Sequence, residues 1–73
     1  MGKLTELPTR RILAALNRAG WVITEGAKHY KLTHLTKPGA LTVPRSKRLR
    51  TGTIRAIIRQ AGLSVEEFFR LYR

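Results

Sequence analysis

The stretch Gly26-Ala27-Lys28-His29-Tyr30-Lys31-Leu32 alternates polar and apolar residues after a glycine that suits a tight turn. This alternation is typical of a half-buried β-strand, in which successive side chains face opposite sides of the sheet. The expected faces are His29, Lys31 and Thr33 on one side, and Tyr30, Leu32 and His34 on the other. Because Tyr30 and Leu32 belong against a core, His29 and Lys31 are predicted to point outward, about 7 Å apart along the strand.

Before this strand, the chain predicts one amphipathic helix. Residues 1–8 read as an irregular lead-in, and Thr9 stands where a helix N-cap is expected, its hydroxyl able to accept from the free N–H groups of the first turn. Apolar residues then recur at helical spacing until Gly20, a natural stop. We therefore expect a helix over about residues 9–19.

Two further strands are predicted around the first. Residues 21–25 are rich in aromatic and β-branched side chains, and residues 40–43 follow a turn signal at Thr36-Lys37-Pro38-Gly39. Pro44 ends the last of these strands. Three strands joined by tight turns predict an antiparallel meander.

The C-terminal third predicts two helices after a basic run, Arg45-Ser46-Lys47-Arg48-Leu49-Arg50. Thr51 or Thr53 is expected to cap the first helix, which ends at Gly62. Ser64-Val65-Glu66-Glu67 is a capping box that begins the second. The predicted fold is a single α+β domain over residues 1–73, in the order α-β-β-β-α-α, with the helices on one face of a three-stranded antiparallel sheet and the other face free.

Charge is the most informative feature of the composition. Fifteen Lys and Arg against four Asp and Glu give a net charge of +11 on 73 residues, well above the roughly 2–8 that solubility requires. Such an excess favours a polyanionic partner, nucleic acid before an anionic membrane. No apolar run approaches the ~20 residues of a membrane span, and the first residues lack a hydrophobic signal region. With no cysteines, we expect a cytoplasmic protein.

The exposed pair on the strand predicts chemistry on a phosphate backbone. A histidine can remove a proton from a ribose 2′-hydroxyl or protonate the leaving oxygen near neutral pH, so His29 is the candidate catalytic residue. Lys31 and Lys28 are expected to offset charge on the phosphate oxygens. The expected contacts with the RNA backbone come from the basic run: Arg45, Lys47, Arg48 and Arg50. We predict no metal site and no cofactor, because the two histidines and four carboxylates are scattered singly.

A pair of histidines acting as base and acid is an alternative. His29 and His34 are five residues apart, an odd number, so in a regular strand they face opposite ways. Only a bulge between them would bring the two rings together.

The motif in residues 26–32 resembles the Gly-Ser-x-His-x-Lys-Leu signature of HicA toxins, the mRNA interferases of HicAB toxin–antitoxin modules. Further stretches are similar to the same family: the helix end with Ala19-Gly20-Trp21, Val43-Pro44-Arg45 at the third strand, and residues 52–64. The likeness is collinear and covers nearly the whole chain.

The resemblance implies a double-stranded-RNA-binding-domain-like fold and ribosome-independent cleavage of mRNA, with His29 at the family's histidine and Lys31 at its lysine. It also implies a HicB-type antitoxin that covers the site, so that a monomeric, strongly basic toxin becomes part of a hetero-oligomer. Ala27 departs from the pattern, because it stands where the family usually has serine. That change puts the full activity of this chain in question.

Two other functions fit parts of the sequence. The same basic sheet and helices could bind double-stranded RNA by its shape and phosphates with no catalysis. A DNA-binding helix-turn-helix could be built from residues 54–61 and 64–72. The second helix, however, begins with Glu66 and Glu67 and then two phenylalanines, which are poorly suited to a DNA groove.

Overall fold

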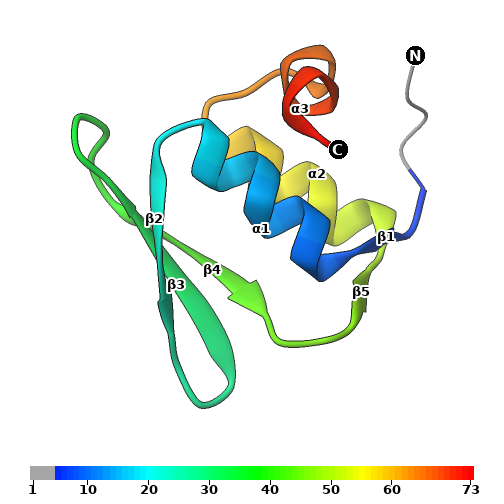
Figure 1. The fold of residues 1–73 in the computed structure, drawn as a ribbon, viewed down its shortest axis with the longest axis horizontal. Helices are drawn as coiled ribbons and strands as arrows, with labels where there is room; N and C mark the ends of the chain where they lie inside the picture. The colour runs from blue at the N-terminus through cyan, green and yellow to red at the C-terminus, as the bar shows by residue number, and fades with distance from the viewer. Residues whose placement is uncertain (1–4) are drawn as a thin grey trace.

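Three helices lie on one face of an antiparallel sheet in the computed structural model, which describes residues 5–73 (Figure 1). The elements in chain order are β1 (Leu7–Pro8), α1 (Thr9–Arg18), β2 (Trp21–Glu25), β3 (His29–His34), β4 (Ala40–Pro44), β5 (Arg48–Leu49), α2 (Thr51–Gln60) and α3 (Val65–Leu71). In the described part of the chain, no helix is long and apolar enough to cross a membrane.

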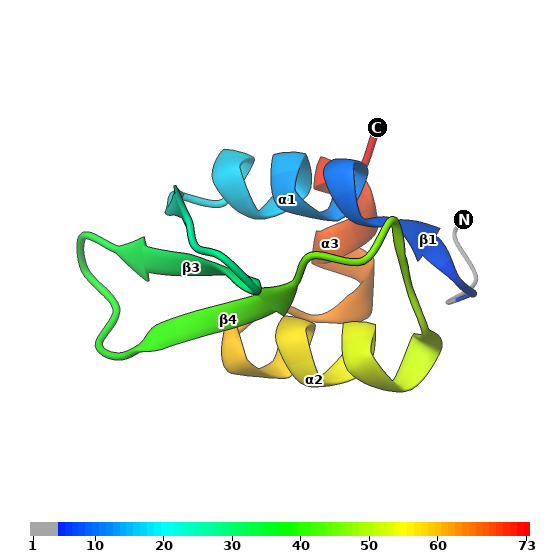
Figure 2. The same ribbon diagram turned by 90° about the horizontal axis from the view of Figure 1, so that it is seen from below.

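The main sheet has the order β2-β3-β4, with β3 in the centre and antiparallel to both neighbours. Helix α1 contacts β2 and α2 contacts β4, while α3 contacts both helices on the side away from the sheet (Figures 1 and 2). The predicted α+β class, the three-stranded meander and the α-β-β-β-α arrangement of a double-stranded-RNA-binding-like domain are therefore confirmed.

One hydrophobic core fills the space between the sheet and the helices. The apolar stripes of α1 and α2 repeat every three or four residues, so each helix turns one continuous face toward the sheet. The inner faces of the strands supply the other half of the core by their two-residue alternation. The largest fully buried side chains are Trp21, Phe68, Ile12, Leu16, Leu32, Ile54 and Val43.

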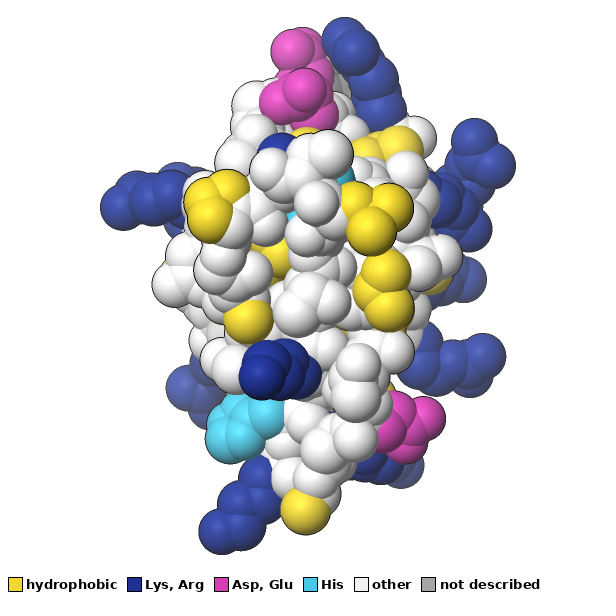
Figure 3. Space-filling view, turned by 90° about the vertical axis from the view of Figure 1, so that its left-hand side faces the viewer, with side chains coloured by type: hydrophobic (Ala, Val, Ile, Leu, Met, Phe, Trp, Pro, Cys, Tyr) yellow, Lys and Arg dark blue, Asp and Glu magenta, His cyan; other side chains and the backbone are white. Residues whose placement is uncertain are grey.

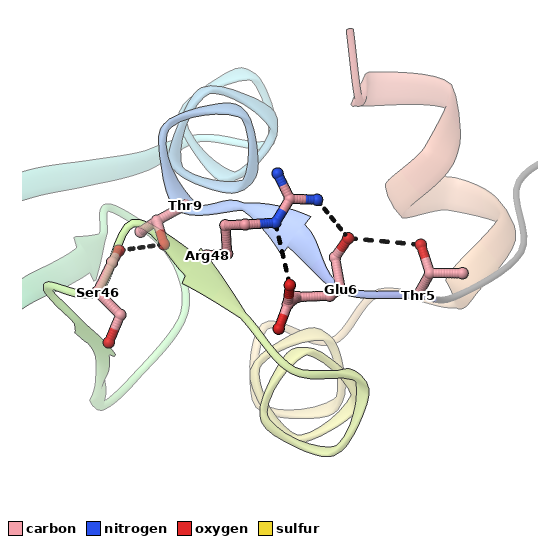
Figure 4. Close-up of polar contacts among 5 residues, drawn as sticks. All are labelled: Thr5, Glu6, Thr9, Ser46 and Arg48. Atoms are coloured by element: carbon pink, nitrogen blue, oxygen red, sulfur yellow. Dashed lines mark hydrogen bonds and ion pairs between the residues drawn. The ribbon is translucent and has the colours of Figure 1, made fainter.

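A second, two-stranded sheet joins regions that the sequence predicts to be irregular. Strand β1 pairs antiparallel with β5, which lies within the basic run (Figure 1). Arg48 donates from Nε to Glu6 Oε1 at 3.1 Å and from Nη2 to the Glu6 carbonyl at 3.1 Å (Figure 4). The end of the lead-in and the basic run thus form regular structure by pairing with each other. Residues 1–4 of the lead-in lie outside the described residues.

Two of the predicted helix caps are wrong and one is confirmed. Thr9 is the first helical residue, after Pro8 at the N-cap, and its hydroxyl donates instead to the Ser46 carbonyl (Figure 4). The reason is tertiary: the loop before β5 passes next to the start of α1, and Thr9 N–H also donates to a carbonyl there, that of Lys47, at 2.9 Å.

Helix α2 likewise begins at one of the residues predicted to cap it, Thr51. Arg50 occupies the N-cap position without a side-chain capping bond, so neither Thr51 nor Thr53 caps the helix. At α3 the capping box is present: Ser64 Oγ accepts from Glu67 N–H at 3.0 Å, and Ser64 N–H donates to Glu67 Oε1 at 2.9 Å. These bonds to Ser64, the backbone one first, lower the pKa of Glu67 below its usual 4.5.

Candidate active site

The outer face of the main sheet is exposed and carries the predicted catalytic pair. The register places Thr24 and Thr42 on either side of Lys31, and His29 opposite Pro44. Most side chains on this face are polar or small, with Val22 and Pro44 as the apolar exceptions, in contrast to the buried inner face. Figure 3 views the side of the molecule on which the sheet lies, where a histidine is exposed next to a cationic side chain and other cations project from the margins. The outer-face residues are Val22, Thr24, His29, Lys31, Thr33, Ala40, Thr42 and Pro44.

A tight turn over residues 26–28 connects β2 to β3 directly before His29. Gly26 N–H donates to the His29 carbonyl oxygen at 2.9 Å. A Cβ atom on Gly26 would lie 2.7 Å from that same oxygen, closer than real Cβ atoms approach backbone. The φ of Gly26 is not in the left-handed region, so the backbone conformation does not demand glycine. The demand comes from the close packing against His29.

The imidazole of His29 makes no hydrogen bond or ion pair with any other described residue, and it is exposed. The same is true of the ammonium groups of Lys31 and Lys28. Both ring nitrogens can thus accept or donate a proton to a bound ligand, and a cation two residues along the same face can offset negative charge there. The arrangement suits acid–base chemistry on a phosphodiester.

His34 lies on the opposite face and serves the fold. Its Nε2 lies 3.1 Å from the Ala19 carbonyl oxygen, and its Nδ1 accepts from Thr36 N–H at 3.1 Å, so the ring is held as the tautomer protonated at Nε2. The ring also packs edge-on against Trp21 at 5.1 Å between centroids. A Cβ on Gly20, whose φ is +102°, would lie 2.6 Å from Nε2. The β2–β3–β4 register is regular, so no bulge brings His34 toward His29.

The four cations of the basic run divide into two kinds. Arg45 and Arg48 are each paired with a carboxylate, at 3.3 Å to Glu25 and 3.1 Å to Glu6. Lys47 and Arg50 are exposed, and their side chains have no hydrogen bond or ion pair within the described residues. Two arginines of the run are thus engaged in contacts within the protein, and the other two cations have no partner among the described residues.

The contacts of Arg45 are a feature that the sequence did not predict. Besides Glu25, its Nη1 donates to the Gly26 carbonyl at 2.9 Å, and its guanidinium carbon lies 4.9 Å from the centre of the Tyr30 ring. The signal lay in the register: Glu25 is opposite Tyr30, and Tyr30 is opposite Val43, two residues before Arg45, which directly follows β4. Among residues 5–73, no three His, Cys, Asp or Glu side chains gather as metal ligands.

Comparison with protein families identifies a family that matches most of the chain. A family model described as the HicA toxin of bacterial toxin–antitoxin systems matches residues 9–63. The matched segment runs from the start of α1 to the residue after Gly62, and it contains the whole main sheet with His29 and Lys31. A search of the curated proteins finds no match.

Proposed function

Because the chain belongs to the HicA toxin family of bacterial toxin–antitoxin systems, we propose that it is an endoribonuclease that cleaves mRNA, with His29 as the catalytic residue. The observation that carries the proposal is the exposed, unpaired imidazole on the free face of the sheet, on the same strand face as the ammonium group of Lys31.

The proposed reaction needs only groups of the RNA and this face of the protein. His29 removes the proton of a ribose 2′-hydroxyl, the 2′-oxygen attacks its own phosphorus, and the bond from phosphorus to the 5′-oxygen breaks. The leaving oxygen takes up a proton, from imidazolium or from water. Lys31, with Lys28 at the turn, stabilises the negative charge that develops on the phosphate oxygens.

We propose that the RNA backbone continues from this face toward the basic run. Among the described residues, no side chain pairs with Lys47 or Arg50 there, whereas the guanidinium groups of Arg45 and Arg48 are already paired. The proposed partner that neutralises the toxin is a HicB-type antitoxin covering the outer face of the sheet. A net charge of +11 would favour an antitoxin with an acidic contact surface and would keep the free toxin monomeric by self-repulsion.

The test is cleavage of a labelled RNA by the wild-type protein and by His29→Ala, with a chelator present. Acid–base catalysis contributes about 10²- to 10⁴-fold, so cleavage should fall by that factor while RNA affinity stays within about two-fold. Thr33→Ala is the matched control, since it truncates an exposed side chain on the same face of the same strand. Undiminished cleavage by His29→Ala would refute the assignment.

A second candidate function is RNA binding without catalysis. Two observations favour it: the described outer face carries no second histidine to act as the acid, and Ala27 replaces the serine usual in the family. This alternative predicts a wild-type protein that binds RNA with a steep salt dependence but leaves it intact. The cleavage assay above separates the two functions, because only the nuclease produces fragments that disappear with His29→Ala.

A further inference from the structure

Three parts of Arg45 hold the turn that precedes His29. Its backbone N–H donates to the Lys28 carbonyl at 3.4 Å and so continues the β3–β4 register by one pair. Its Nη1 donates to the Gly26 carbonyl at 2.9 Å and lies 3.3 Å from Glu25 Oε1. Its guanidinium also lies over the ring of Tyr30 at 4.9 Å. Arg45, the residue after β4, therefore holds the turn at both of its ends.

From these contacts we infer that Arg45 is a positioning residue for His29 and not a ligand for RNA phosphate. The inference rests on the proposed nuclease function and identifies a further residue that this function needs. Arg45 holds Gly26 in place through the Gly26 carbonyl. Because Gly26 N–H donates to the His29 carbonyl, this contact also holds the backbone from which the imidazole projects.

The contacts together suit a guanidinium. Nη1 donates to a carbonyl and a carboxylate while the planar group lies over an aromatic ring, whereas the ammonium of lysine is a compact point charge that cannot do both. Arg45→Lys should therefore keep the charge yet lose much of the positioning. A phosphate ligand, by contrast, would be largely replaceable by lysine.

The protein contains its own control for this experiment. Arg48 forms a second arginine–glutamate pair, with Glu6, at the β1–β5 sheet. Glu25→Gln and Glu6→Gln each remove one carboxylate charge and one such pair, but only Glu25 is next to the turn before His29. Comparing the two variants separates positioning at the turn from the general effect of adding positive charge.

The experiment measures single-turnover cleavage at saturating RNA, RNA affinity at several salt concentrations, and thermal unfolding of each variant. For Arg45→Ala and Arg45→Lys we expect the cleavage rate to fall about 10-fold to 10²-fold, the range that a misplaced catalytic group costs, with affinity within about two-fold for the lysine variant. Glu25→Gln should cleave more slowly although its RNA affinity is unchanged or higher. Glu6→Gln should cleave at the wild-type rate.

A readout without RNA keeps this inference distinct from the proposed function. Amide exchange of Gly26 and backbone ¹⁵N order parameters at Ala27 and Lys28 report opening of the turn. Both should show greater mobility in Arg45→Ala and Glu25→Gln than in the wild-type protein and Glu6→Gln. If the wild-type protein leaves RNA intact, the nuclease proposal fails while this readout still decides whether Arg45 holds the turn.

The inference would be overturned by the behaviour of a phosphate ligand. In that case Arg45→Ala would reduce the slope of log affinity against log salt by about one, Arg45→Lys would restore affinity, and the saturated cleavage rate would not change. Unaltered exchange at Gly26 in Arg45→Ala would equally overturn it.

Discussion

Replacing Gly26 by alanine tests how closely the turn before His29 is packed. The added Cβ would lie 2.7 Å from the His29 carbonyl oxygen, which is backbone and cannot rotate away. The strands must separate locally, and the 2.9 Å hydrogen bond from Gly26 N–H to the same oxygen weakens with them.

The expected loss of stability can be estimated from these contacts. Overpacking costs about 1–3 kcal/mol, and a hydrogen bond between backbone groups contributes about 0.5–1.5 kcal/mol. Alanine recovers about 0.4–1 kcal/mol by restricting the unfolded chain. The net loss in unfolding free energy for Gly26→Ala is about 2 kcal/mol, or a fall in Tm on the order of 10 °C for a domain of this size.

Urea denaturation and thermal unfolding measure this loss, with Gly52→Ala as the matched control. Gly52 lies in the first turn of α2, and a Cβ there would meet no atom within 4 Å. Alanine at Gly52 should therefore raise stability by about 0.5–1 kcal/mol. Equal stability of Gly26→Ala and the wild-type protein would refute the argument from close packing.

Three further predictions concern the histidines, the capping box and the free cations. His34→Ala should lower the unfolding free energy by about 2–3 kcal/mol in urea, since it removes the ring's hydrogen bonds with Ala19 and Thr36 and its packing on the buried Trp21, whereas His29→Ala should change it by less than about 0.5 kcal/mol; equal losses would contradict the different roles. The pKa of Glu67 is lowered in the folded state, so its contribution to stability is present above pH 4.5 and is lost as pH falls through the lower folded value. Unfolding curves of Glu67→Gln should lack this acid-side loss, and parallel pH profiles for both proteins would count against it. Lys47→Ala and Arg50→Ala should each reduce the salt dependence of RNA binding by about one unit of slope, measured by titration at several salt concentrations, and an unchanged slope would remove that residue from the RNA path.

Local pattern was sufficient to predict the main sheet and its two faces. The alternation from His29 to Leu32 fixed which side chains face the core, because a one-residue slip would bury a histidine and a lysine and expose the leucine. The exposed positions of His29 and Lys31 and the buried position of Leu32 confirm that pattern. The capping box at Ser64 was predictable for the same reason, since both partners lie within four residues.

Features that depend on distant parts of the chain were not predictable. Strands β1 and β5 have two residues each, too few to show any periodicity, and they pair across some forty residues of sequence. Thr9 does not act as a cap because that same pairing brings the Ser46 carbonyl to its hydroxyl. The contacts of Arg45 likewise follow from the register of three strands, which the charge run that follows β4 does not reveal.

Trp21 gives the molecule a built-in optical probe. It is the single tryptophan of the chain, only 1% exposed, and it packs edge-on against His34 at the far end of β3 from His29. Its emission should shift to longer wavelength when the core unfolds. It should not change when a ligand binds to the outer face of the sheet. Intrinsic fluorescence can therefore follow the integrity of the fold while a labelled oligonucleotide independently reports occupancy.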